Sequence, residues 1–194
     1  AVTLGISSCD DYLDKLPDNR MELNSKEKVQ QFLVSAYPDH NPALLAEMYS
    51  DNSDEFKVTS WTSAGRFQDQ AYAWADITEI SESETPQEIW NSLYKAMGTA
   101  NTALKAIRDN GNTDDYQPSK GEALLCRAYA AFQLANTFCM AYDATTAEKY
   151  MGVPYPTEPE TKVGTTYKRG TLAAFYDQMN RDIEEGLPLI TDNY

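Results

Sequence analysis

Apolar side chains recur at helical spacing in several segments of the chain. The pattern predicts helices over about 25–37, 85–110, 119–138 and 171–187, and a shorter helix after Asn41-Pro42. No segment shows the alternation of apolar and polar residues that is typical of a half-buried strand. We therefore expect an all-α fold of antiparallel, tetratricopeptide-like helical pairs (an α-α superhelix), although the sequence contains no exact repeat.

Polar residues mark where three of these helices begin. Asn24 followed by Glu27 predicts a cap for the first helix. Thr85-Pro86-Gln87-Glu88 is a capping box with proline at the first helical position, which is the clearest helix start in the chain. Ser119 with Glu122 predicts the start of the next helix.

Two long segments lack the helical period. Residues 50–84 are rich in polar and aromatic side chains, and residues 139–170 contain three prolines that favour extended backbone. Connections of this length inside a compact domain are unusual, and they often bind a ligand or a partner. We expect long irregular loops of this kind between the helical pairs.

The charge of the chain excludes some classes of partner. Thirty acidic and 16 basic side chains give a net charge of −14 and a sequence pI near 4.4. Such a chain repels phosphate backbones and anionic lipid headgroups, so we expect no nucleic acid partner. The single histidine, His40, has no companion for a triad or a multi-histidine metal site, and no phosphate-binding loop is present. We expect no catalytic residue, no metal and no cofactor.

The first cysteine follows a short apolar segment. Residues 1–8 resemble the end of a secretory signal, and Ile6-Ser7-Ser8-Cys9 resembles a bacterial lipobox, in which the cysteine becomes a lipidated N-terminus. Two or more acyl chains on that residue hold a protein stably to a bilayer. The alternative is an apolar chain start with an ordinary free cysteine.

The other two cysteines lie in one helical pattern. Cys126 and Cys139 are 13 residues apart, which is about 20 Å along a helix. A disulfide requires Cα atoms within about 7 Å. We predict that both thiols are free and buried.

One long segment resembles a known family. Residues 121–158, GEALLCRAYAAFQLANTFCMAYDATTAEKYMGVPYPTE, are similar to the SusD/RagB family of outer-membrane nutrient-binding lipoproteins. Supporting motifs are Glu47-x-x-x-Asp51-Asn52, Trp90-x-x-x-Tyr94 leading to Asn101, and Arg169-Gly170-Thr171 leading to Tyr176 and Asp182. The resemblance extends over nearly the whole chain.

The resemblance implies a fold, a location and a function. Family members are all-α lipoproteins at the cell surface that pass oligosaccharides, or sometimes peptides, to a TonB-dependent (SusC-like) outer-membrane transporter, and they are not enzymes. By this resemblance residues 1–8 are a signal-peptide remnant and residues 9–194 are the N-terminal helical domain, truncated before the C-terminal part of the family. Cys9 would carry the lipid anchor in the outer membrane, with the protein facing the exterior.

Sugar binding requires aromatic faces for stacking and planar polar groups for hydrogen bonds to hydroxyls. The segment 50–84 concentrates these residue types, and the candidate ligand-binding residues are Asp51, Asp54, Trp61, Arg66, Tyr72, Trp74 and Asp76. The alternative for this segment is that its aromatic residues pack under the loop while its carboxylates cap turns. Trp90 and Tyr94, four residues apart, are interpreted as helix packing.

Two other functions remain open at this point. A helical scaffold that docks another protein, without glycan binding of its own, would fit the helix pairs and the acidity. A glycoside hydrolase has only the abundance of Asp and Glu in its favour.

Overall fold

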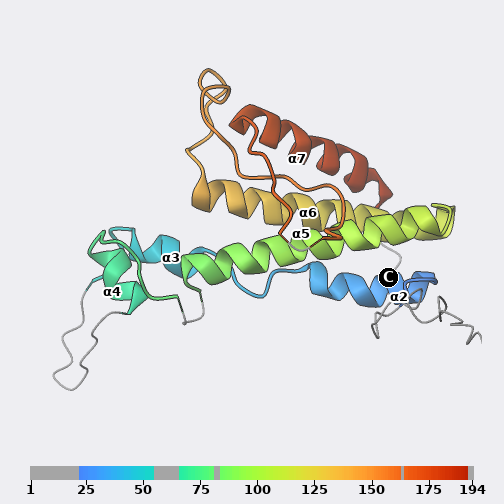
Figure 1. The fold of residues 1–194 in the computed structure, drawn as a ribbon, viewed down its shortest axis with the longest axis horizontal. Helices are drawn as coiled ribbons and strands as arrows, with labels where there is room; N and C mark the ends of the chain where they lie inside the picture. The colour runs from blue at the N-terminus through green and yellow to red at the C-terminus, as the bar shows by residue number, and fades with distance from the viewer. Residues whose placement is uncertain (1–21, 55–65, 81–83, 163, 192–194) are drawn as a thin grey trace, which may run out of the picture.

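The fold is built from α-helices, as the sequence predicts. The computed structural model describes residues 22–54, 66–80, 84–162 and 164–191 (Figure 1). The elements in these ranges are α2 (Lys26–Leu33), η1 (Val34–Ala36), α3 (Ala43–Met48), α4 (Phe67–Tyr72), α5 (Pro86–Asp109), η2 (Asp114–Tyr116), α6 (Gln117–Phe138), α7 (Leu172–Gly186) and η3 (Leu187–Leu189). Extended pairing in the described part of the chain is confined to one isolated bridge, Met151 with Thr171.

The long helices α5 and α6 form the central antiparallel hairpin (Figure 1). Helix α5 begins where the capping box predicts: the Thr85 side chain accepts a hydrogen bond from the Glu88 amide, and Pro86 occupies the first turn. At the other end Gly111 adopts φ +86°, a left-handed conformation that glycine takes without steric cost. The sequence therefore contains both the start and the stop of this helix.

Helix α6 is packed between neighbours on several sides. It contacts α5, α7 and α2, which explains why its sequence carries apolar residues on two faces (Figure 1). Helices α6 and α7 approach each other closely at two glycines. A Cβ at Gly121 would lie 2.8 Å from the Gly186 carbonyl oxygen, and a Cβ at Gly186 would lie 2.9 Å from Leu124 Cβ.

Two hydrophobic clusters divide the core along the hairpin. One joins α2 to the C-terminal half of α5 and the N-terminal half of α6, through residues such as Val29, Leu33 and Ile107. The other joins α3, α4 and α7 to the opposite half of the hairpin, with Phe67 as its largest fully buried side chain. The helices α3 and α4 are thereby fixed at one end of the molecule (Figure 1).

Three predicted boundaries are corrected by the structure. The cap of α2 is Ser25, whose hydroxyl accepts from the Lys28 amide, and not Asn24, whose side chain binds the Lys28 ammonium instead. Helix α6 begins at Gln117, because Pro118 occupies its first turn, so Ser119 lies inside the helix and is buried. Residues 50–84 are not wholly irregular, because α4 lies among them.

The segment between α6 and α7, described over 139–162 and 164–171, is an irregular strap that is extended around its prolines, as the sequence predicts. It returns across the helices, and three backbone hydrogen bonds join its first part to the start of α7 and the residue just before the cap. They run from Gly152 N to Gly170 O at 3.0 Å, from Leu172 N to Tyr150 O at 2.8 Å and from Ala173 N to Ala147 O at 3.3 Å. The Arg169 guanidinium reinforces this junction by donating to the Gly152 carbonyl at 2.7 Å. The strap therefore has a fixed path over the helical layer.

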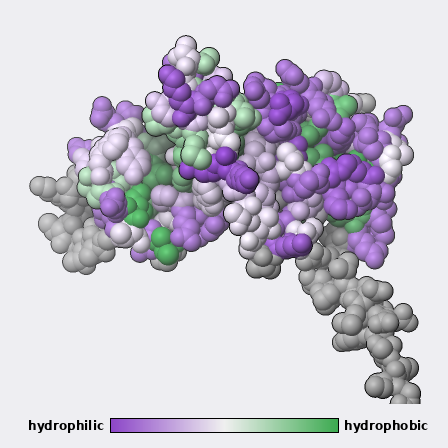
Figure 2. All heavy atoms as spheres, turned by 45° about the horizontal axis from the view of Figure 1, so that its top comes forward, coloured by the Kyte–Doolittle hydropathy of each residue, from purple (hydrophilic) through white to green (hydrophobic). Residues whose placement is uncertain are grey.

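The two cysteines in the described ranges are free, as predicted. Cys126 is buried, as predicted, whereas Cys139 is only half-buried, because it caps the partly exposed C-terminal end of α6. None of the described helices is long and apolar enough to cross a membrane. Figure 2 shows a face on which hydrophilic side chains predominate, with smaller hydrophobic patches between them.

Candidate functional site

Four of the seven predicted ligand residues lie on α4 and the chain that follows it. Arg66 is the N-cap residue of α4, and its guanidinium pairs with Asp69 through two contacts of 3.3 Å. Tyr72 is the last residue of the helix, and its side chain is 42% exposed. Trp74 and Asp76 follow within the next turn, and both are exposed.

Trp74 has the most exposed large hydrophobic side chain of the described residues, at 75%. Its backbone adopts φ +53°, and its amide donates to the Ala71 carbonyl at 3.0 Å, which closes the C-terminal turn of α4. A bulky residue in this left-handed region is strained, at about 1–3 kcal/mol, and such strain is concentrated at functional sites. The strained backbone holds an aromatic ring in solvent.

The chain after Trp74 is fastened back to α4. The Gln70 side-chain carbonyl accepts from the Thr78 amide at 2.9 Å, and the Gln70 amide group donates to the Thr78 hydroxyl at 2.9 Å. This loop is therefore closed at its base, which fixes the backbone that carries Trp74 and Asp76.

Tyr49, which is not among the predicted ligand residues, forms an aromatic surface together with Tyr72 and Trp74. Tyr49 caps the C-terminus of α3, and its ring centroid lies 4.9 Å from that of Trp74 in an edge-on arrangement of 61°. Such a contact restricts the tryptophan ring, most of which stays exposed to solvent. The sequence feature that could have indicated Tyr49 is its place as an aromatic residue at a helix end, two positions before Asp51.

The acidic residues after α3 lie on a well-defined turn. The Glu47 carbonyl accepts from the Ser50 amide, the Ser50 hydroxyl and the Ser53 hydroxyl, at 3.1, 2.8 and 2.8 Å. Asp51 and Asp54 lie on this turn with exposed side chains. Their turn and Trp74 belong to neighbouring elements, because Tyr49 joins α3 to the end of α4. Trp61 and Cys9 fall outside the described residues.

A cavity of about 570 Å³ adjoins this surface. It lies between α3 and α6, with Tyr49 on one wall and Tyr129 and Gln133 on the other. The Gln133 amide donates to the Tyr129 hydroxyl at 3.1 Å, which leaves both polar groups at the cavity wall. Its volume is in the range of small-molecule sites, which combine apolar walls with a few polar groups. Tyr49 thus separates the exposed ring of Trp74 from a recess.

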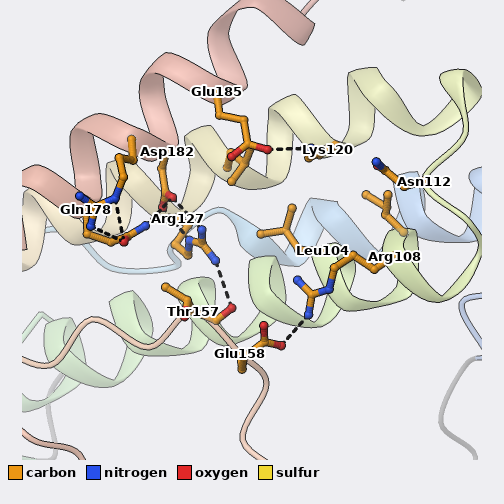
Figure 3. Close-up of a pocket in the computed structure, with 13 residues that line it drawn as sticks. Leu104, Arg108, Asn112, Lys120, Arg127, Thr157, Glu158, Gln178, Asp182 and Glu185 are labelled. Atoms are coloured by element: carbon orange, nitrogen blue, oxygen red, sulfur yellow. Dashed lines mark hydrogen bonds and ion pairs between the residues drawn. The ribbon is translucent and has the colours of Figure 1, made fainter.

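The most strongly connected polar group in the described ranges lies elsewhere, between α6 and α7 (Figure 3). The Arg127 guanidinium donates to both carboxylate oxygens of Asp182, at 2.6 and 2.7 Å, and to the Asn101 side-chain carbonyl at 2.8 Å. The Tyr155 hydroxyl donates to Asp182 at 2.7 Å. These groups are buried or nearly so, and their polar atoms are satisfied within the network.

This network is suited to holding the fold. Burial disfavours the charged guanidinium, but the hydrogen bonds and charge of Asp182 outweigh it and raise the pKa of Arg127. Burial, together with the negative charge of Asp182, also raises the pKa of Tyr155, so the phenol stays protonated as a donor. Two flanking ion pairs, Lys120–Glu185 and Arg108–Glu158, line a cavity of about 460 Å³ beside it (Figure 3).

Metal-binding groups of three or more acidic, histidine or cysteine side chains do not occur among the residues that the structure describes. The described part of the chain provides exposed aromatic residues, recesses and hydrogen-bonding groups, which suit the binding of a polar organic ligand.

Comparison with known proteins agrees with this architecture. Residues 11–194 match the SusD-like family described as "Starch-binding associating with outer membrane". A solved structure of a SusD superfamily protein from Bacteroides thetaiotaomicron has the same fold, with a TM-score of 0.59 and 20% sequence identity. The alignment covers 86% of this chain but 38% of that protein. No curated protein matches the sequence. The chain belongs to the SusD-like family that this description names.

Proposed function

We propose that this chain binds an oligosaccharide at the surface formed by Tyr49, Tyr72 and Trp74 and delivers it, without chemical change, to a TonB-dependent transporter of the outer membrane. The observation that supports this most directly is the exposed ring of Trp74 on a strained, fastened turn. An exposed, oriented aromatic face is what the C–H face of a sugar requires. The match to a starch-binding family agrees with that ligand class.

The polar residues around the ring supply the second requirement. The carboxylates of Asp51 and Asp76 are exposed acceptors for sugar hydroxyls. Asp54 is exposed on the same turn as Asp51, and Arg66, paired with Asp69, lies at the start of α4. The net charge of −14 opposes an anionic glycan, so we propose a neutral one. The cavity beyond Tyr49 would accommodate an adjoining part of the same ligand.

Native affinity electrophoresis through gels that contain neutral polysaccharides, starch among them, tests this function. We expect one glycan to retard the chain and to retard Trp74→Ala clearly less. Phe132→Ala is the matched control, because Phe132 is also an exposed aromatic residue, at 44%, but lies on α6 outside the proposed surface. Equal retardation of the wild type and Trp74→Ala would contradict the proposed surface.

The alternative function is a helical scaffold that docks a protein and binds no glycan. It predicts that no polysaccharide in the panel retards the chain. The alternative also predicts that the protein still copurifies with an outer-membrane transporter, since docking to a protein does not depend on a sugar. A result of this kind would overturn glycan capture while leaving the partner in place.

We further propose that Cys9 carries a lipid that anchors the protein in the outer membrane with its helices facing the exterior. The lipobox-like sequence before Cys9 and the family's association with the outer membrane support this. Metabolic labelling of the precursor with a palmitate analogue should label the wild type and Cys126→Ala but not Cys9→Ser. Accessibility of the labelled protein to protease added to intact cells tests its orientation.

A further inference from the structure

A second cleft lies between α5 and the strap that follows α6. It has a volume of about 310 Å³, and none of its lining residues belongs to the Trp74 surface. Three aromatic side chains, Trp90, Tyr94 and Tyr167, contribute to its walls. Trp90 and Tyr94 pack against the core, as the sequence predicts, yet both are only partly buried and line this cleft as well.

The walls of the cleft are fixed by hydrogen bonds from α5 to the strap. The Tyr94 hydroxyl donates to the Pro154 carbonyl at 2.8 Å, and the Asn101 amide group donates to the Pro156 carbonyl at 2.9 Å. The buried pair of Arg127 and Asp182 secures Asn101 and Tyr155 behind these contacts. A site whose walls are already ordered loses little conformational entropy when it binds.

The floor of the cleft is a glycine in the middle of a helix. Gly98 lies near the centre of α5, where glycine costs about 1 kcal/mol relative to alanine. Gly121 has a packing reason, since a Cβ there would strike backbone, but a Cβ at Gly98 would meet nothing within 4 Å. Packing within the described chain therefore does not require this glycine, whereas any larger side chain would project into open space over the floor of the cleft.

The chemistry of the cleft fits a sugar. Trp90, Tyr94 and Tyr167 offer ring surfaces, and the Glu160 carboxylate is an exposed acceptor at the rim. Glu158, paired with Arg108, adds a second acidic group. Two carboxylates oppose an anionic ligand. The volume is at the lower end of ligand sites, which fits a short part of a chain and not a long one.

We propose that this cleft is a second saccharide subsite, which holds a short segment of a neutral oligosaccharide over Gly98. The inference rests on the proposed glycan-binding function, but it concerns different residues. A chain with two separate subsites would hold one polysaccharide at two points, or two chains at once, and would gain avidity in the first case.

Titration of the isotope-labelled chain with maltoheptaose, cellohexaose, xylohexaose and mannohexaose tests the proposal by NMR. The reporters are the Gly98 amide and the Trp90 indole N–H for the cleft, and the Trp74 indole N–H for the other surface. With one of these sugars, we expect saturable shifts at both places. Trp74→Ala should leave the shifts of the cleft reporters intact.

Gly98→Leu should fill the cleft and weaken binding seen at the Trp90 indole by at least tenfold, while the Trp74 indole still shifts. Because Gly98 is in a helix with open space above it, the variant should fold, and Tyr167→Ala provides a second way to remove a wall. Shifts at Trp74 alone would overturn the second subsite and leave the proposed function standing. The absence of shifts at both places would overturn both.

Discussion

Arg127 on α6 and Asp182 on α7 form a forked ion pair, 55 residues apart in sequence, that is almost completely buried. Its two hydrogen bonds of 2.6 and 2.7 Å join the two helices, and Asn101 and Tyr155 extend it to α5 and the strap. Four separate parts of the chain therefore meet at one charged pair.

Removal of one member of the Arg127–Asp182 pair should strongly destabilise the fold. Arg127→Met leaves the Asp182 carboxylate buried without its cation, and we expect a loss of about 3–5 kcal/mol in the free energy of unfolding. Urea denaturation measures this directly. The double variant Arg127→Met/Asp182→Leu should recover much of the loss, because no unpaired charge is left. A single variant within 1 kcal/mol of the wild type would show that the pair does not hold the helices together.

Two helical glycines, Gly121 near the start of α6 and Gly98 near the centre of α5, should respond oppositely to replacement by alanine. Gly121→Ala places a Cβ 2.8 Å from a backbone oxygen of α7, so the helices must separate, and we expect a destabilisation of about 1–3 kcal/mol. Gly98→Ala meets no neighbour and should stabilise the chain by up to about 1 kcal/mol. Thermal and urea unfolding of the pair tests this, and equal effects would contradict the close approach of α6 and α7.

The cap of α7 should contribute about 1 kcal/mol. The Thr171 hydroxyl accepts from the Ala174 amide at 3.1 Å, and Thr171→Ala leaves that amide without its partner. Thr113→Ala is the matched control, since Thr113 precedes the 3₁₀ helix η2 without a side-chain capping bond. We expect the control to be nearly neutral in urea unfolding. A loss of similar size in both variants would argue against the capping bond.

The Cys126 thiol should make stability depend on pH in the alkaline range. Burial, with the nearby Glu122 charge, raises the pKa of Cys126 from 9.0 to about 11. The unfolded chain then releases this proton at a lower pH than the folded one. The contribution is fully present below about pH 9 and is lost progressively as pH rises towards 11.

The comparison of wild type and Cys126→Ala isolates that effect. The difference in their free energies of unfolding should become smaller, or change sign in favour of the variant, between pH 8 and pH 10.5. Titratable groups that do not interact with Cys126 cancel in this difference. A difference that stays constant over this range would contradict the raised pKa.

Local sequence signals were sufficient for most of the helical framework. The start of α5 at Thr85-Pro86 depends only on residues within its first turn, and its stop at Gly111 depends only on residues within its last turn. Both ends can therefore be predicted without any tertiary contact. Helix α4 is different, because only Phe67 and Ala71 of its six residues are buried. These two residues pack against the N-terminal half of α5 and the C-terminal half of α6. The existence of α4 depends on contacts that sequence periodicity does not contain.

The sequence indicates which residue types form the candidate binding surface, but it does not indicate how they are arranged in space. The aromatic and acidic residues of segment 50–84 point to this region. Tyr72 and Trp74 lie at the C-terminal turn of α4, and Asp76 follows two residues later. Tyr49 was missed because its link to Trp74 crosses between two helices. The pairing of Arg127 with Asp182, and the cleft over Gly98, likewise arise only when distant segments meet.

Calorimetric titration of the wild type and Trp74→Gly with the neutral glycan that retards the chain is the most direct test of the central claim. Glycine relieves the backbone strain at φ +53° while it removes the ring, so we expect the free energy of unfolding to stay within about 1 kcal/mol. Affinity should fall at least tenfold, which corresponds to about 1.4 kcal/mol. If Trp74→Gly binds the glycan as tightly as the wild type, the exposed ring is not the binding surface and the account is wrong.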